Sequence, residues 1–287
     1  MFIDAPPGRL HVEQAGDHGP PVILLSGAGI DNARLSWKRL LPVLAERHRV
    51  LAPDWPRQGK TTEWSGLADH AAMLGCVDTV MDHFGLDRAA LVGLSQGGAI
   101  ALSYAIEHPE RADRVVAVAP AGILRFLPVV HQMFWLSAKL PWLTSGLSHM
   151  MLSSRSGVKR LVRTGLFAGP SHDFDDVVDD ILAEVRANGV RASDWQNASI
   201  GFWRMNVDLM PDLHRIECPV LFIQGDKDVA VPPARTREAA DRVKDAEFVL
   251  LEGHGHWPNR QSPDRIADLV TRFLDRRQAR ADADDHG

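Results

Sequence analysis

The sequence predicts an α/β fold in which helices cover both faces of a mostly parallel sheet. Short apolar runs rich in β-branched residues are bounded by glycine and proline and alternate with segments of helical periodicity. Such alternation is typical of parallel sheets. The chain has 287 residues, of which 45% are hydrophobic and 24% charged, as in an ordinary globular protein with a substantial core. The predicted strands are residues 22–25, 50–52, 89–94, 115–119, 220–223 and 248–251.

Helices are predicted between these strands. Residues 67–84 have helical spacing and stop at Gly85, residues 99–107 precede Pro109, and residues 266–276 follow Pro263. Residues 2–14 are expected to add one or two antiparallel edge strands. The tail, residues 278–287, is charged, small and aperiodic, and we expect it to fray.

The alternation stops between residues 123 and 214, which predicts an inserted helical cap on a core made of residues 1–122 and 215–277. This segment holds four of the eight Trp, five of the eight Met and five of the ten Phe. Helix packing explains most such side chains, and we expect some of them to line an apolar substrate cavity beneath the cap. The acidic stretch at residues 173–180 begins an amphipathic helix, which favours a solvated helix face over a metal site.

Composition disfavours several classes of partner and site. Lys and Arg total 32 against 37 Asp and Glu, a net charge of −5, so nucleic acid and membrane surfaces are not expected as partners. Cys76 and Cys218 lie far apart, which suggests neither a disulfide nor a metal site. The start has no pattern of a signal peptide and no stretch is apolar enough to span a bilayer, so we expect a cytoplasmic protein. The sequence leaves a homo-oligomer open.

The most informative motif is Gly93-Leu94-Ser95-Gln96-Gly97, which lies between a predicted strand and a predicted helix. A serine on so tight a turn needs glycine two residues before and two residues after it, because a side chain there would collide with the neighbouring strand or helix. The turn exposes the serine hydroxyl and aims a helix N-terminus at any developing oxyanion. Ser95 is therefore the predicted nucleophile.

With this motif, residues 20–122 and 215–275 resemble the capped serine hydrolases of the α/β-hydrolase superfamily. The resemblance implies a sheet of the eight-stranded type and a chain order of nucleophile, acid and histidine. The acid is then expected after residues 220–223, where the family spacing GxxD selects Asp228 and leaves Asp226 as the alternative. The other family location for the acid, after residues 115–119, offers no carboxylate.

The resemblance also places the histidine and the oxyanion donors. His256 matches the family pattern Gly-His-aromatic-Pro, with His254 as the alternative and Trp257 expected at the substrate. The Gln96 amide is one expected oxyanion donor. The resemblance implies that the Ala28 amide is the second oxyanion donor, and the neighbouring Gly27 is expected to contact substrate.

The chain departs from the family pattern at two places. Ser26 stands where relatives usually have histidine, and Arg57-Gln58 replaces Gly-His. Neither departure removes a triad member, so the reaction class is unaffected, but the loop that shapes the substrate pocket is expected to be unusual.

Competing motifs are weak. Gly59-Lys60-Thr61 lacks the earlier glycine of a phosphate loop, and Gly27-Ala28-Gly29 lacks the third glycine of a dinucleotide site. No cofactor or metal is expected. Epoxide and haloalkane hydrolases of this fold use an aspartate nucleophile, and Ser95 occupies that position.

Three functions remain open. The favoured one is a carboxylesterase or lactonase that acts on a small to medium apolar ester. The second is hydrolysis of a carbon–carbon bond in a ring-cleavage diketone, suggested by the pair His256-Trp257 and by Arg204 beside Trp203 in the cap, where such enzymes use an arginine. Trp203 is accordingly expected to contact substrate. The third is a catalytically silent member of the fold that binds a small molecule.

Overall fold

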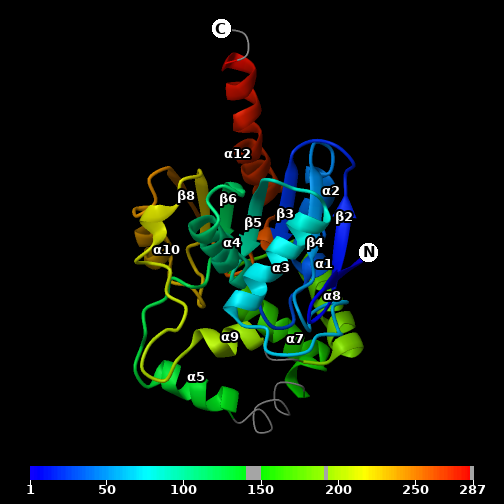
Figure 1. Ribbon diagram of the computed structural model, residues 1–287. Helices are drawn as coiled ribbons and strands as arrows, with labels where there is room; N and C mark the ends of the chain where they lie inside the picture. Colours follow the sequence, from blue (N-terminus) through cyan, green and yellow to red (C-terminus); the bar gives the residue numbers. More distant parts are fainter. Residues whose placement is uncertain (140–149, 191–192, 285–287) are drawn as a thin grey trace.

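An eight-stranded sheet forms the centre of the computed structural model, which describes residues 1–139, 150–190 and 193–284, with side chains as far as Arg276 (Figure 1). The strand order is β1-β2-β4-β3-β5-β6-β7-β8. β1 and β2 pair antiparallel, as do β2 and β4, and every other pairing is parallel. The strands are β1 (Phe2–Ala5), β2 (Gly8–Ala15), β3 (Pro21–Leu25), β4 (Arg49–Pro53), β5 (Ala89–Leu94), β6 (Ala112–Val118), β7 (Val220–Gly225) and β8 (Ala246–Leu251). The predicted fold class, including the antiparallel edge, is confirmed.

Helices cover both faces of the sheet because alternate strand residues point to opposite sides. Ile23 and Leu25 of β3 pack in one apolar cluster, with α3 (His70–His83), α4 (Gln96–Glu107) and α10 (Pro233–Ala240). Val22 and Leu24 pack in the other cluster, with the helices that connect β3 to β4 and the helices that follow β8. These helices are α1 (Ala33–Trp37), α2 (Leu40–Leu44) and α12 (Pro263–Asp284), the last preceded by the short α11 (Pro258–Gln261).

The described part of the segment between β6 and β7 is helical and lies at one end of the sheet (Figure 1). We call residues 123–214 the cap. Its elements are α5 (Val130–Lys139), α7 (Arg155–Leu161), the π-helical turn η1 (Val162–Leu166), α8 (Phe174–Asn188), α9 (Asp194–Ser199) and the 3-10 turn η2 (Leu213–Arg215).

Charged contacts attach the cap helix α8 to the core. Asp180 accepts hydrogen bonds from Lys38 at 2.9 Å and from Arg260 at 3.0 Å. The Arg260 side chain is fully buried, so Asp180 provides the countercharge that a buried guanidinium requires. Asp173 pairs with Arg39 at 2.7 Å. The acidic stretch at the start of α8 therefore contacts core cations as well as solvent.

The helix α12 continues through Asp284, into the tail that we expect to fray. Its Ala, Arg and Gln residues are good helix formers, and they extend a helix whose first half is anchored in the core. Residues 285–287 of the predicted frayed tail lie outside the described residues. Among the described residues, no helix combines the length and the apolar character needed to cross a membrane.

Candidate active site

The turn after β5 places Ser95 in an unusual backbone conformation. Its φ of 52° lies in the left-handed region, where a side chain is strained, and such strain is typical of functional turns. A Cβ on Gly93 would lie 2.1 Å from the carbonyl oxygen of Gly97, and one on Gly97 would lie 2.1 Å from that of Leu25. The two glycines are therefore obligatory, for the steric reason that the sequence motif suggests. Ser95 itself lines a cavity under the cap.

A carboxylate and an imidazole meet beside this serine. Asp228, after β7, lies 2.8 Å from Nδ1 of His256, after β8. The second oxygen of the carboxylate accepts the amide hydrogens of Ala230 and Val231, at 2.8 and 3.0 Å. Burial acts to raise the pKa of Asp228, but the hydrogen bonds to its carboxylate outweigh burial and hold this pKa below its usual value.

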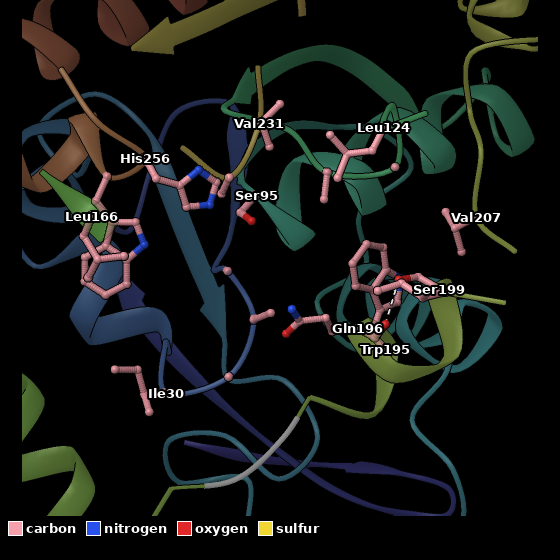
Figure 2. Close-up of a pocket in the computed structure, with 18 of the residues that line it drawn as sticks. Ile30, Ser95, Leu124, Leu166, Trp195, Gln196, Ser199, Val207, Val231 and His256 are labelled. Atoms are coloured by element: carbon pink, nitrogen blue, oxygen red, sulfur yellow. Dashed lines mark hydrogen bonds between the residues drawn. The ribbon is translucent and has the colours of Figure 1, made fainter. Parts of the chain in front are cut away.

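The ionisation state of Asp228 determines which nitrogen of the His256 ring carries the proton. An ionised carboxylate can only accept, so Nδ1 of His256 carries the proton of the neutral ring and Nε2 is left as an acceptor. Ser95 and His256 both line the cavity, where Figure 2 labels them. The structure therefore brings the three predicted residues together from the ends of β5, β7 and β8.

The two alternative residues have other partners. Asp226 accepts the amide hydrogen of Gly253 at 2.7 Å. His254 contacts the carbonyl oxygen of Glu252 and the hydroxyl of Ser262, both at 2.7 Å. Both ring nitrogens of His254 are thus occupied away from Ser95, which favours His256.

The loop after β3 brings Gly27 and Ala28 to the cavity wall beside Ser95. The Gly27 amide donates to Asp31 at 2.6 Å, and Asp31 also accepts from the Ser36 hydroxyl at 2.5 Å. Burial raises the pKa of Asp31 to about 6, despite these hydrogen bonds. Asp31 thus fixes the loop that carries Ala28.

Gln96 begins α4, and the amide groups in the first turn of a helix have no acceptor within the helix. Its backbone is therefore suited to the predicted role of oxyanion donor. Its side chain is buried and points away, with the amide oxygen accepting a hydrogen bond from Ser193 at 2.8 Å.

The departures from the family pattern shape the same loop. Gln58 donates to the carbonyl oxygen of Gly29 at 3.0 Å, across the base of the loop. The Ser26 carbonyl accepts from the Trp55 indole at 2.8 Å, while the Ser26 hydroxyl is buried without a partner among the described residues. Arg57 forms an ion pair with Asp194 at the start of α9. The substituted segment therefore connects the core loop to the cap.

The cavity has a volume of about 490 Å³ and a largely apolar wall. Trp257 lines it, as predicted from its place beside His256. None of its described lining residues is Lys, Arg, Asp or Glu. Elsewhere, too, the described residues contain no group of three or more His, Cys, Asp or Glu side chains suited to a metal ion.

The expectation for Trp203 is wrong. Its side chain is 77% exposed, packs edge-on against Phe202 and is not part of the cavity wall. Ile200 and Met205 pair across a short bridge and both line the cavity, so the turn between them carries Trp203 outward. Arg204 lines a separate surface hollow and is likewise outside the cavity.

The sequence did not single out several cavity residues. His131, Trp195 and Gln196 come from the cap, and Figure 2 shows the Gln196 amide pointing into the cavity. Helical periodicity marks buried faces, but it does not show which side chains on them reach a cavity. Asp31 was also missed, because an acidic residue in a loop usually lies in solvent.

Comparisons with known proteins identify the family of the chain. A model of the alpha/beta hydrolase fold family matches residues 20–263. The chain is similar to a 2-hydroxy-6-oxo-6-phenylhexa-2,4-dienoate hydrolase from Burkholderia cepacia, with 28% identity over 93% of this chain and 91% of that one. It is similar to a 2-hydroxymuconate semialdehyde hydrolase from a Pseudomonas species, with 28% identity over 92% and 89% of the two chains.

Solved structures give the same fold. An enol-lactonase from Burkholderia xenovorans superposes with a TM-score of 0.75 at 24% identity, covering 96% of this chain and 99% of the other. A serine hydrolase from a Cycloclasticus bacterium superposes with a TM-score of 0.77 at 23% identity, covering 96% and 97%. With the family match over most of its length, this chain belongs to the alpha/beta hydrolase fold family.

Proposed function

We propose that this protein is a serine hydrolase that cleaves small to medium, uncharged and largely apolar carboxylic esters or lactones. The observation that carries the proposal is the cavity around Ser95, about 490 Å³ in volume, whose described wall residues include no Lys, Arg, Asp or Glu. Such a wall favours apolar ligands, because their apolar surface is buried on binding. A charged group on the substrate would find no countercharge there.

In the proposed reaction, the Ser95 hydroxyl oxygen attacks the ester carbonyl carbon and His256 Nε2 takes its proton. Asp228, at 2.8 Å from Nδ1, stabilises the imidazolium that forms. The Ala28 and Gln96 amides stabilise the oxyanion. The carbon–oxygen bond to the leaving group breaks, and the leaving group takes the proton from His256. Water then attacks the acyl-enzyme, loses its proton to His256 and releases the acid, and Ser95 regains its proton.

Hydrolysis of a carbon–carbon bond is the second candidate, favoured by the identity shared with the dienoate hydrolase. A dienoate carries a carboxylate, and the cavity wall offers it no described cation because Arg204 lies elsewhere. A silent binding protein is the third candidate. It is disfavoured because a binding protein has no need for the contact between Asp228 and His256.

A fluorophosphonate probe tests whether Ser95 is activated. We expect covalent labelling of the wild type and none of Ser95→Ala. Ser262→Ala is the matched control, because that hydroxyl also contacts a histidine, His254, at 2.7 Å. It should leave labelling intact. A folded wild type that stays unlabelled would overturn the proposal.

A substrate panel tests the chemical class. Nitrophenyl esters graded by chain length, several lactones and a ring-cleavage dienoate would be compared by kcat/KM. Uncharged esters or lactones should be the best substrates. A dienoate turned over more efficiently than every neutral substrate would assign the second function instead.

A further inference from the structure

His131 is a buried histidine in the cavity that the proposed reaction does not use. It lies at the start of α5 in the cap, is 7% exposed, and shares the cavity wall with Ser95. Its ring packs against Phe126, with the centroids 5.4 Å apart. The ring is therefore held in place by the protein around it.

One hydrogen bond fixes which nitrogen of this ring carries the proton. The Leu127 amide donates to Nδ1 of His131 at 2.7 Å. A backbone amide can only donate, so Nδ1 is unprotonated and the neutral ring holds its proton on Nε2. Burial lowers the pKa of His131 from its usual value, which favours this neutral form near pH 7.

The described residues form no hydrogen bond with Nε2, and this atom is not among the fully enclosed side-chain atoms that lack a partner, so the donor keeps some exposure where His131 lines the cavity. The described cavity wall is apolar at Leu124, Met205 and Val207, and the Gln196 amide on the same wall forms no hydrogen bond with His131. The Ser199 hydroxyl also lines the cavity and donates to the Gln196 carbonyl at 2.9 Å, but it forms no hydrogen bond with His131. An N–H group in such a setting is costly to desolvate unless a ligand provides an acceptor.

We propose that His131 is a specificity-determining residue whose Nε2 hydrogen is donated to a second, uncharged oxygen of the substrate, away from the carbonyl that Ser95 attacks. The inference rests on the proposed ester or lactone hydrolysis and narrows it. The preferred substrates are then esters or lactones that carry a ketone or ether oxygen in the part lying under the cap. A neutral N–H suits such an oxygen, whereas a carboxylate would call for a cation.

Matched substrate pairs test this assignment. Nitrophenyl esters of keto acids, with the ketone moved stepwise along the acyl chain, would each be compared with the ester that has a methylene at that position. Acetates of keto alcohols, each compared with the acetate of the matching alcohol without the ketone, test whether the second oxygen lies in the leaving group. The wild type should prefer at least one ketone member by about five- to tenfold in kcat/KM, the effect of one neutral hydrogen bond.

Three variants separate substrate contact from local structure. His131→Gln carries a nitrogen donor at the same number of bonds from Cα as Nε2, and should keep the preference. His131→Asn carries an acceptor where Nδ1 lies and can keep the Leu127 contact, but it has no donor that reaches as far as Nε2. His131→Asn and His131→Phe should both treat the two members of each pair alike while still hydrolysing the methylene ester.

Measurements of binding test the role of His131 without relying on turnover. Ketone analogues in which a methylene replaces the ester oxygen can be titrated by quenching of tryptophan fluorescence, since Trp195 and Trp257 line the cavity. The same ketone preference is expected in these dissociation constants. If the wild type binds both members of every pair equally, or if His131→Asn keeps the preference, the assignment to His131 is wrong. If the protein hydrolyses no ester but still binds the ketone members more tightly, that result would count against the proposed function and not against the role of His131.

Discussion

The Ser193 hydroxyl donates a hydrogen bond to the side-chain oxygen of Gln96 across 2.8 Å, and so joins the residue after Ser95 to the first turn of α9. Ser193 also accepts the amide hydrogen of Gln196 at 3.2 Å, which makes it the N-cap of that helix. One side chain therefore positions both the turn that carries the predicted nucleophile and the cap helix that faces it.

Ser193→Ala should reduce activity as well as stability. Losing the N-cap should cost about 1 kcal/mol of unfolding free energy, and the unpaired Gln96 oxygen should disturb the Ser95 turn. We expect kcat/KM to fall roughly tenfold, equivalent to about 1.4 kcal/mol. Ser154→Ala is the control, because Ser154 caps α7 in the same way without contacting Gln96. Equal activity losses in the two variants would contradict a specific role for Ser193.

Asp228→Asn should almost abolish turnover. The amide would present a donor to Nδ1 of His256 and favour the tautomer in which Nε2 cannot accept the Ser95 proton. We expect kcat to fall by about a thousandfold or more, measured on the best ester of the panel. Asp226→Asn, two residues earlier, should keep kcat within about threefold, since its carboxylate contacts Lys227 and the Gly253 amide, not His256. The reverse ranking would assign the acid to Asp226.

Asp180→Ala should destabilise the protein more than other acidic changes on α8. It removes the carboxylate that pairs with Arg260, a fully buried guanidinium, and we expect a loss of about 3 kcal/mol in the free energy of unfolding. Asp176→Ala removes a carboxylate on the same helix that is 60% exposed and pairs with Arg39 at 3.4 Å. That change should cost about 0.5 kcal/mol or less. Urea unfolding compares the two variants directly, and similar losses would mean that Asp180 is not the required countercharge.

Asp31→Asn should change how stability depends on pH. The carboxyl titrates near 3.9 in an unfolded chain, whereas burial raises the pKa of Asp31 to about 6 in the folded protein. Between these values the folded state holds a proton that the unfolded chain has released. The contribution of Asp31 to the free energy of unfolding is therefore greatest at low pH and declines as pH rises through this window.

The variant has no such titration. The wild type should therefore lose about 1 kcal/mol of unfolding free energy relative to the variant between roughly pH 5 and pH 7. Denaturant unfolding at the two pH values measures this shift. Asp268→Asn, on the exposed face of α12, controls for the loss of one negative charge. A difference that stays constant with pH would show that Asp31 does not titrate in this range.

The sequence predicted the features that local patterns specify. Glycine spacing around Ser95 reflects steric contacts within one turn, and strand alternation records which faces are buried, so both can be recognised without coordinates. Asp228 and His256 followed from the family motif. In each case the deciding information lies within a few residues of the side chain concerned.

The features that were missed or mistaken depend on packing between distant segments. Trp203 belongs to an aromatic-rich stretch, but a turn between two inward-facing residues carries it outward. Asp31 resembles an ordinary loop acid until Gly27 and Ser36 are seen to donate to it. His131 gains its importance from a cavity wall that several cap segments form together. Periodicity along one segment carries no record of such neighbours.

The far end of α12 offers a practical point of attachment. This helix ends on the side of the molecule opposite α5 and α9 (Figure 1). A tether to a solid support at that end would keep the cap helices α5 and α9 away from the support. Immobilised protein should then hydrolyse its substrates at nearly the rate of the free form, which suits repeated use on a bead or a sensor chip.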